Sequence, residues 1–599
     1  MYDYAQVHVL YTIPPAIALT IVLGPLFTRR DIFKLGFLLA VAVTYTIPWD
    51  SYLIRTGVWT YPSDVILGPK LFDIPAEELF FFVIQTYITT CLQILSNKSV
   101  VTATFLRNEE DRRDAVGRSL KNWKCAGQII FGLCSVLPIV AHGGQSTGTY
   151  MKLILGWSAP VLLVLWTFAY QLLVALPWTK TWLPVFIPTL YLWVIDTLAL
   201  RRGTWCIESD TKLGIQVWPH LDIEEAVFFL VTNTLVVWGS FAYDNAVAVL
   251  DAFPDLFPSV AGTPSPASLL QALFLPTSEY DTARIQSLQN ALAVLARKSR
   301  SFYLASGVFT GRLRIDLILL YAFCRIADDL IDDAPSSEEG DMWVQHFSNF
   351  LDSVYSTEHD PERFEQALAP FPAKAQSILV SLPTSKLPPE PLYSLLDGFR
   401  IDQQFLRGGP QQGLPIQTFS NLERYASCVA ATIGELCLSL VYQHNPDRLT
   451  DEAVQQKCLA AGGQMGRALQ YVNIVRDVAT DAQGGRCYIP NEWFSNPSAT
   501  SPDMHNQEVA HHRKLILDIA FDTYAKNRDA IEDLPRYAQG GVRVAVESYM
   551  EIGRILRERM QQGKPLDFTG GGKKGRASVP RSRRIWVGWK TMAGWRGPT

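Results

Sequence analysis

Long apolar stretches dominate the first 243 residues of the chain, whereas later residues alternate between apolar and polar at helical spacing. A helix needs about 20 apolar residues to cross a bilayer. Seven stretches approach or exceed that length: Ala5–Phe27, Leu35–Leu53, Leu79–Leu95, Cys125–Ala141, Leu153–Val174, Leu183–Leu200 and Ala226–Tyr243. So many stretches in so short a segment favour membrane spans over one large buried core. We therefore predict a seven-span helical membrane domain over residues 1–243.

Lys and Arg are distributed unevenly among the short loops between these stretches. The loop between the third and fourth stretches carries seven of them: Lys98, Arg107, Arg112, Arg113, Arg118, Lys121 and Lys124. Positive residues mark the cytoplasmic side of a membrane protein. This loop, and after seven spans the C-terminal half, is therefore expected in the cytosol. Arg201, Arg202 and Lys212 fall on the opposite side and do not fit. The sequence does not identify which membrane is used, and the endoplasmic reticulum and lipid bodies are the candidates.

The predicted spans contain an internal repeat. Residues Pro48–Trp59 align with Val194–Trp205, and in both an Asp precedes a Gly by seven residues and a Trp by nine. Further on, Glu77–Phe82 aligns with Glu224–Phe229. The first three spans therefore repeat as the last three, with one span between them. An odd connecting span gives both copies the same orientation, so their acidic residues are expected at one face, around one central cavity.

Each copy places one Asp at the end of a span and two Glu at the start of the next. The candidate catalytic residues of this half are Asp50, Glu77, Glu78, Asp196, Glu224 and Glu225. Ionisable groups at membrane depth are costly and usually functional, although single acids at span ends are also common. A carboxyl group shielded from water can hold its proton near neutral pH and protonate a polyene. Neighbouring aromatic faces can stabilise the resulting cation.

These motifs resemble the membrane-integral lycopene cyclases of fungi, archaea and some bacteria. The resemblance implies β-ring formation at the ends of lycopene, and we expect no cofactor for this half. The second copy departs from the first, because it has Val194 and Ile195 before its Asp, and Asp222 where the first copy has Pro75. These differences leave open whether the copies share one role and which glutamate donates the proton.

The segment after the last predicted span changes in composition. Residues 244–278 contain five prolines, which favour an extended, semi-rigid linker. Residues 279–569 have the apolar spacing of a soluble helical domain. Residues 570–599 form a basic tail that contains Trp and is expected to touch a membrane surface.

Two segments of the C-terminal half place acidic residues four positions apart. Asp328 and Asp332 share one helix face, and Asp477 and Asp481 repeat the spacing after Asn473. Like charges at this spacing repel on an isolated helix. They become favourable around Mg²⁺, which prefers oxygen ligands and bridges carboxylates to phosphates. The pattern predicts a site for Mg²⁺, or alternatively Mn²⁺, that binds a diphosphate.

From about Ser278 to Arg559 the chain resembles phytoene and squalene synthases. The resemblance is carried by the two aspartate segments and by Lys298–Tyr303, Gly398–Asp402, Val429–Gly434 and Gly485–Pro490. It implies an all-α isoprenoid synthase fold and three groups of residues. The metal ligands would be Asp328, Asp332, Asn473, Asp477 and Asp481. The substrate-binding residues would be Arg300, Ser301, Tyr321, Arg325, Gln470, Arg476 and Arg486. Tyr425 would lie near the reacting carbons.

Joined in this order, the two halves resemble the fungal bifunctional lycopene cyclase/phytoene synthases. The resemblance implies that two geranylgeranyl diphosphates condense to phytoene through prephytoene diphosphate. It also implies that lycopene returns for cyclisation, with a phytoene desaturase as an expected partner. The alternative is a squalene synthase-like enzyme that uses NADPH and has a non-catalytic membrane anchor. A seven-span retinal protein is disfavoured because the last span lacks lysine. The net charge of -4 gives no indication of nucleic-acid binding.

Overall fold

The computed structural model describes residues 3–108, 120–140, 147–260, 262–357, 360–407, 414–444, 451–495, 507–564, 566 and 577–598. Arg112, Arg113, Arg118, Ala141 and the tail residues 570–576 and 599 lie outside them. The chain divides into two compact units, Met1–Ile285 and Gln286–Thr599. The regular secondary structure of their described residues is helical apart from strands of two or three residues. This confirms the predicted all-α class.

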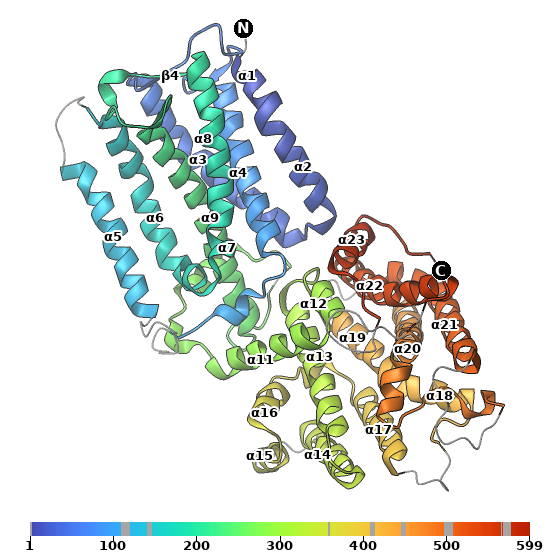
Figure 1. Ribbon diagram of the computed structural model, residues 1–599. Coiled ribbons are helices and arrows are strands. Elements are labelled where there is room, and N and C mark those ends of the chain that lie inside the picture. Colours follow the sequence, from blue (N-terminus) through green and yellow to red (C-terminus); the bar gives the residue numbers. More distant parts are fainter. Residues whose placement is uncertain are drawn as a thin grey trace. The chain divides into compact units, whose positions relative to one another are not determined.

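The first unit is built of long helices that run side by side (Figure 1). They are α1 (Asp3–Val7) continued through a π-helical turn (His8–Thr12) into α2 (Ile13–Leu23), then α3 (Arg29–Arg55), α4 (Ala76–Asn97), α5 (Leu120–Val140), α6 (Thr149–Ala175), α8 (Leu183–Arg202) and α9 (Ile223–Ala252). Shorter helices are Gly24–Leu26, Thr102–Phe105, α7 (Trp178–Thr181), Ser209–Thr211, α10 (Pro266–Phe274) and Thr277–Glu279. Helix α11 (Thr282–Lys298) begins at the end of this unit.

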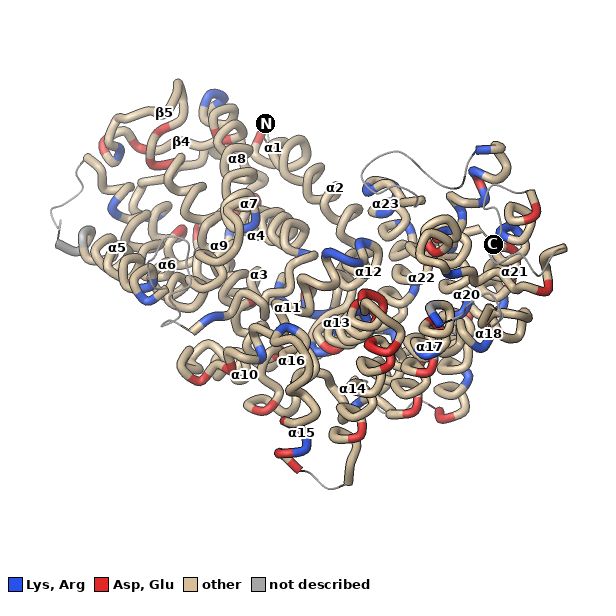
Figure 2. The backbone as a smooth tube through the Cα atoms, turned by 60° about the horizontal axis from the view of Figure 1, so that its bottom comes forward, with Lys and Arg blue, Asp and Glu red and all other residues tan. Residues whose placement is uncertain are grey.

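Each of the seven apolar stretches forms a helix, as predicted. Six of them, all except α5, are long and apolar enough to cross a membrane by length and composition. Helix α5 has 21 residues, and at 1.5 Å per residue it measures about 31 Å, close to the thickness of a bilayer core. The long helices carry charged residues mainly toward their ends (Figure 2). This pattern is the one expected of helices surrounded by lipid.

The repeated glycines have matching structural roles in the two copies. Gly57 ends α3 and Gly203 ends α8, and both have a φ of +73°, a conformation that favours glycine. The chain then enters β1 (Trp59–Thr60) in one copy and β4 (Cys206–Ile207) in the other. These strands pair antiparallel, with Trp59 opposite Ile207. The repeat thus brings the acidic ends of both copies to the same end of the helical bundle (Figure 1).

Two short hairpins complete this end of the unit. Strands β2 (Lys70–Leu71) and β3 (Ile74–Pro75) pair before α4, and β5 (Gln216–Trp218) and β6 (Leu221–Asp222) pair before α9. Each hairpin therefore leads directly into the helix that begins with the Glu pair of its copy.

Helix α9 continues to Ala252, into the segment expected to be a linker. The reason is that its acidic residues have cationic partners. Asp244 accepts from Lys34 at 3.0 Å, and Asp251 pairs with Arg30 at 2.6 Å. Ala246, Ala248, Val249 and Leu250, which lie between them, are buried. Proline interrupts the chain only afterwards, and α10 forms within the remaining linker.

The second unit is a bundle of helices around two apolar clusters. Its longer helices are α11 (Thr282–Lys298), α12 (Arg300–Ser306), α13 (Gly311–Asp332), α14 (Ser337–Tyr355), α15 (Pro361–Leu368), α16 (Ala373–Val380), α17 (Pro389–Arg407), α18 (Phe419–Ala426), α19 (Thr432–Gln443), α20 (Glu452–Gln483), α21 (Gln507–Asn527), α22 (Arg536–Gln561) and α23 (Arg581–Met592). Short 3-10 turns are Thr384–Lys386, Asn491–Trp493 and Arg528–Asp533, and a π-helical turn (Ser427–Ala431) joins α18 to α19.

The described part of the basic tail packs within this second unit. Helix α23 lies against α22, where Arg583 pairs with Glu551 at 2.5 Å and with Glu558 at 2.6 Å. Trp586 of the same helix is 55% exposed. The predicted contact of the tail with a membrane surface stays a prediction.

Candidate active sites

The second unit contains a cavity of about 950 Å³. All the residues expected to bind metal or substrate in this half line it: Arg300, Ser301, Tyr321, Arg325, Asp328, Asp332, Tyr425, Gln470, Asn473, Arg476, Asp477, Asp481 and Arg486. Helices α13 and α20 contribute the two aspartate segments, and α12 contributes Arg300 and Ser301. Residues far apart in the sequence therefore meet in one place.

Cationic side chains accompany the aspartates of this cavity. Arg325 contacts Asp328 at 2.8 Å, Arg486 donates to Asp332 at 2.9 Å, and Arg476 pairs with Asp477 at 2.6 Å. Acidic residues gather at the end of α13 (Figure 2). Burial, together with the neighbouring Asp332, raises the pKa of Asp328 to about 7, against the lowering effect of Arg325. A cation bound beside Asp328 would favour its carboxylate form, because it would offset the repulsion from Asp332.

The donor set of this site fits Mg²⁺. It consists of carboxylate and amide oxygens, which are the ligands of a hard cation. Among the described residues, no group of three or more His, Cys, Asp or Glu lies close enough to hold one ion by itself. Mg²⁺ commonly takes only one or two carboxylates and completes its shell with waters and substrate phosphates. A site shared between two helices and a diphosphate has this composition.

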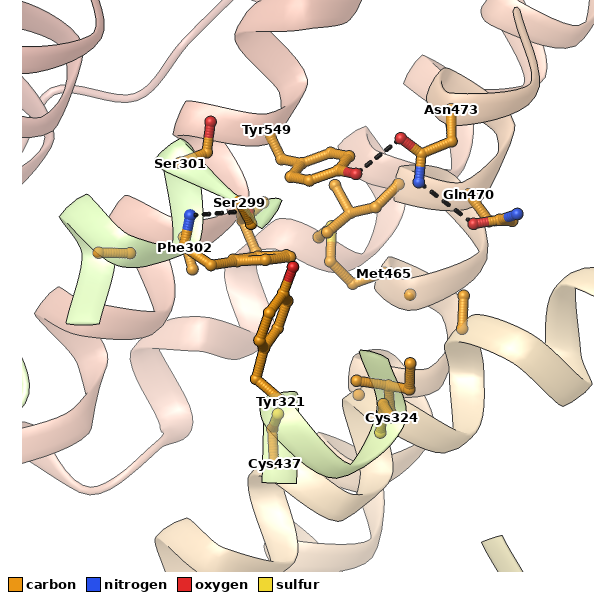
Figure 3. Close-up of a pocket in the computed structure, with 18 of the residues that line it drawn as sticks. Ser299, Ser301, Phe302, Tyr321, Cys324, Cys437, Met465, Gln470, Asn473 and Tyr549 are labelled. Carbon is orange, nitrogen blue, oxygen red and sulfur yellow. Dashed lines mark hydrogen bonds between the residues drawn. The ribbon is translucent and has the colours of Figure 1, made fainter. Parts of the chain in front are cut away.

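Hydrogen bonds position the polar groups between α20 and α12. Tyr549 of α22 donates to Asn473 at 2.6 Å, and Asn473 donates to Gln470 at 3.2 Å. The ring of Tyr549 stacks on Phe302, with centroids 5.1 Å apart. Figure 3 shows these side chains around the cavity, with Tyr321 pointing toward Phe302. Tyr549 belongs to this site although no sequence motif pointed to it.

Asp402 of α17 is a second residue that sequence reasoning did not place in the site. It lines the cavity and is only 4% exposed. It accepts hydrogen bonds from Tyr425 at 3.1 Å and from Tyr488 at 2.6 Å. Burial raises its pKa to about 7, against the lowering effect of Tyr488. Asp402 therefore fixes the orientation of Tyr425, and its place in the Gly398–Asp402 segment was the available signal.

Much of the rest of the cavity wall is apolar. Residues Phe419–Gln443 also meet the length and composition of a membrane span, but they belong to the second unit and supply Val429, Ile433 and Leu438 to the cavity. Gly434 and Gly466 allow this segment to pack against α20, because a Cβ at either position would lie within 2.5 Å of backbone atoms. The cavity thus joins a charged end to a lining suited to hydrocarbon chains.

The acidic residues of the first unit lie in a second candidate site. Asp50, Glu77, Glu78, Asp196, Glu224 and Glu225 are all buried. Glu78 accepts from the hydroxyls of Tyr4 and Tyr61, and Glu225 accepts from Tyr150 at 2.6 Å. Tyr4 and Tyr150 occupy matching places in the two copies. The structure therefore extends the repeat to residues that the sequence comparison had not aligned.

Aromatic side chains fill the space beside these acids. The ring of Trp49 stacks on Trp157 and on Phe228, at centroid distances of 4.6 and 5.6 Å. Trp59 meets Phe228 edge-on at 5.5 Å. A cavity beside Phe81 measures about 20 Å³, which is far too small for the end group of a polyene. An end group of a polyene would therefore enter this core only if side chains moved.

Comparison with known proteins identifies the family. The chain is 48% identical over 603 residues to the bifunctional lycopene cyclase/phytoene synthase of Pyrenophora tritici-repentis, and the alignment covers 99% of both chains. The chain belongs to this family. The bifunctional lycopene cyclase/phytoene synthase of Phaeosphaeria nodorum is also 48% identical, with 99% of both chains covered, and that of Neurospora crassa is 44% identical, with 98% covered.

The squalene/phytoene synthase family matches residues 295–583. The crystal structure of a dehydrosqualene synthase aligns with 52% of this chain and 96% of its own, at 20% identity and a TM-score of 0.39. Full-length membership in the bifunctional lycopene cyclase/phytoene synthase family confirms the predicted class of enzyme. It also speaks against the alternative of a squalene synthase-like enzyme with an inert anchor.

Proposed function

We propose that the second unit condenses two geranylgeranyl diphosphates head to head into phytoene, through prephytoene diphosphate. The observation that carries this proposal is the single cavity in which two aspartate segments, several arginines and an apolar wall come together. A charged end suits the diphosphates, and the apolar wall suits two prenyl chains. Family membership supports the same reaction.

The residues of the cavity would divide the work of this reaction. Asp328, Asp332, Asn473, Asp477 and Asp481 would hold Mg²⁺, or alternatively Mn²⁺. When bound, the metal neutralises charge on the departing diphosphate. Arg325, Arg476 and Arg486 add fixed positive charge at the same end of the cavity. Cleavage of the carbon–oxygen bond then leaves an allylic cation, which the double bond of the second substrate attacks. Tyr425, held by Asp402, would lie beside these carbons.

We propose that the first unit closes the ends of lycopene into β-rings. A carboxylic acid protonates the terminal double bond, the next double bond attacks the cation, and loss of a proton restores neutrality. No electrons are gained or lost, so the reaction needs no redox cofactor. The buried acids and the aromatic core beside them support this proposal, because aromatic faces stabilise cations in surroundings that exclude water.

The helices of the first unit support a further proposal on location. We propose a multi-pass membrane protein whose second unit lies in the cytosol, as the distribution of Lys and Arg predicts. The endoplasmic reticulum and lipid bodies are the candidate membranes. A phytoene desaturase is the expected partner, because phytoene must be desaturated before it can return as lycopene.

Purified chain in lipid vesicles tests both activities separately. With labelled geranylgeranyl diphosphate and Mg²⁺, we expect labelled phytoene, and a chelator should abolish it. With lycopene alone, we expect cyclised carotene whether or not the chelator is present. Labelled squalene-type product that requires NADPH would refute the proposed synthase reaction. Recovery of unchanged lycopene from folded protein would refute the proposed cyclase reaction.

A further inference from the structure

Six of the buried acids of the first unit form three pairs of equivalent residues with different surroundings. We infer that Asp50 and Asp196 donate the proton that starts ring closure, that Glu78 and Glu225 remove the proton that ends it, and that Glu77 and Glu224 only fasten the loops. This inference rests on the proposed cyclase function. It assigns separate tasks to residues that the sequence motif presents together.

The first glutamate of each pair is bound to the backbone of the preceding loop. Glu77 accepts from the backbone N–H of Leu67 at 2.5 Å, and Glu224 accepts from that of Leu213 at 2.6 Å. The two bonds are equivalent in the two copies. Each closes the loop that precedes a β-hairpin and the following helix. Glu77 and Glu224 therefore hold the acidic end of the unit in shape.

The second glutamate of each pair faces phenolic hydroxyls instead. One carboxylate oxygen of Glu78 accepts from Tyr4 and, at 2.8 Å, from Tyr61. Tyr150 donates to Glu225 at 2.6 Å. Hydrogen bonds donated to a carboxylate stabilise its ionised form. These two glutamates are accordingly prepared to be bases.

Asp50 has fewer hydrogen-bond donors than Glu78, and the donor to Asp196 is farther away than the donor to Glu225. Asp50 is fully buried, and neither of its carboxylate oxygens has a hydrogen-bond partner among the described residues. Asp196 accepts from Trp205 at 3.1 Å through one oxygen, while its other oxygen has no partner in the same part of the chain. A buried carboxyl group without donors or a cation keeps its proton, because ionisation would leave an unsolvated charge.

The acids also act on one another electrostatically. Asp50 lies within range of Glu78, and Asp196 lies within range of Glu225, Asp222 and Glu78. Among the described residues, no member of the Asp50–Glu78 pair or the Asp196–Glu225 pair forms an ion pair with Lys, Arg or His. Two neighbouring buried carboxyl groups without a cation cannot both ionise readily, so each Asp–Glu pair shares one proton. The hydroxyl donors place the negative charge on Glu and leave the proton on Asp.

The reaction balances with these roles. The Asp carboxyl gives its proton to the terminal double bond of lycopene, which leaves a tertiary cation. The neighbouring double bond supplies an electron pair, so a carbon–carbon bond closes the ring and the cation moves to a ring carbon. Glu then takes the proton from the adjacent ring-junction carbon, and the β-ring double bond forms. Transfer of this proton from Glu to Asp restores the starting state.

Acid and base can be told apart by their products. We would express the full chain and three double variants in bacteria that make lycopene, and resolve the carotenes by chromatography and mass spectrometry. The variants are Asp50→Asn with Asp196→Asn, Glu78→Gln with Glu225→Gln, and Asp73→Asn with Asp210→Asn. The last is the matched control, because Asp73 and Asp210 are exposed acids in the segments that precede α4 and α9. Protein amount and melting temperature in detergent are measured for each chain.

We expect the aspartate variant to accumulate open lycopene at an unchanged melting temperature, since asparagine resembles the neutral acid. The Glu78/Glu225 variant should make at least tenfold fewer β-rings than the unchanged chain. It should instead form rings with misplaced double bonds or an added hydroxyl, because the cation still forms. The Asp73/Asp210 variant should make β-rings as the unchanged chain does. The inference is overturned by β-rings from the aspartate variant, by only open lycopene from folded Glu78/Glu225 variant, or by ring loss in the folded control. Absence of rings from the unchanged chain would refute the proposed cyclase function itself.

Discussion

Asp402 allows a quantitative test of how the synthase site is built. Its carboxyl group is 4% exposed and accepts from two tyrosine hydroxyls. In the Asp402→Asn variant, the side-chain oxygen still accepts a hydrogen bond from one tyrosine hydroxyl. The side-chain NH₂ group can donate a hydrogen bond to the oxygen of the other hydroxyl. The replacement removes only the ionisable group. The predicted effect is therefore a change in how stability depends on pH.

The magnitude follows from the raised pKa of Asp402. Its ordinary value is 3.8 and its value in the fold is about 7. Folding thus favours the protonated form, so its stabilising effect is complete below about pH 4 and is lost as pH rises through 7. At about 1.4 kcal/mol per pKa unit, the whole loss is about 4 kcal/mol, of which about 2.5 kcal/mol falls between roughly pH 5 and 7.5.

Urea titration with a short protease pulse measures this loss in the full chain. The amount of intact second unit at each urea concentration gives its free energy of unfolding at about pH 5 and 7.5. The drop between these pH values should be smaller in the Asp402→Asn variant by about 2.5 kcal/mol. An equal drop in both chains would refute the assignment of a buried, proton-holding Asp402. Asp397→Asn, an exposed change in the same helix, is the matched control and should leave the drop unaltered.

Three further predictions concern the two halves. Asp328→Ala or Asp477→Ala should lower phytoene formation from labelled geranylgeranyl diphosphate roughly 10²–10³-fold. Lycopene supplied in vesicles should still be cyclised by these variants. Loss of both activities together would contradict separate sites. Gly203→Ala should destabilise the first unit by about 1 kcal/mol. A Cβ at this position would meet no neighbouring atom, but the φ of +73° is unfavourable for alanine. An unchanged melting temperature in detergent would contradict this prediction. Glu77→Ala should lower the free energy of unfolding of the first unit by about 1–3 kcal/mol more than Glu77→Gln does, because it leaves the Leu67 N–H without its acceptor. Equal melting temperatures of the two variants would refute the role of Glu77 in fastening the loop.

The sequence predicted more of the synthase site than of the cyclase site. Asp328 and Asp477 carry a spacing that has meaning on a helix, so their faces and their place in one common site could be inferred from the sequence alone. Asp402 and Tyr549 have no such spacing, and only packing brings them to the cavity. In the first unit, the repeat located the acids but not their partners. Tyr4 lies 74 positions from the Glu78 that it contacts, and no local pattern indicates such a pairing.

Boundaries between elements were harder to infer for a related reason. Helix α9 runs past residue 243 because Asp244 and Asp251 meet Lys34 and Arg30 from another helix. Their charges look like the start of a linker when the sequence is read alone. Similarly, Phe419–Gln443 has the composition of a membrane span, but its apolar residues face a cavity and a core.

The central claim is that one chain carries both phytoene synthesis and ring closure. The most direct test expresses it in a bacterium that supplies geranylgeranyl diphosphate and a lycopene-forming desaturase, followed by chromatography of the pigments. Cyclised carotene is the predicted result, because it requires both units. Lycopene without rings would contradict the cyclase assignment, and the absence of any pigment from cells that contain the folded chain would contradict the synthase assignment.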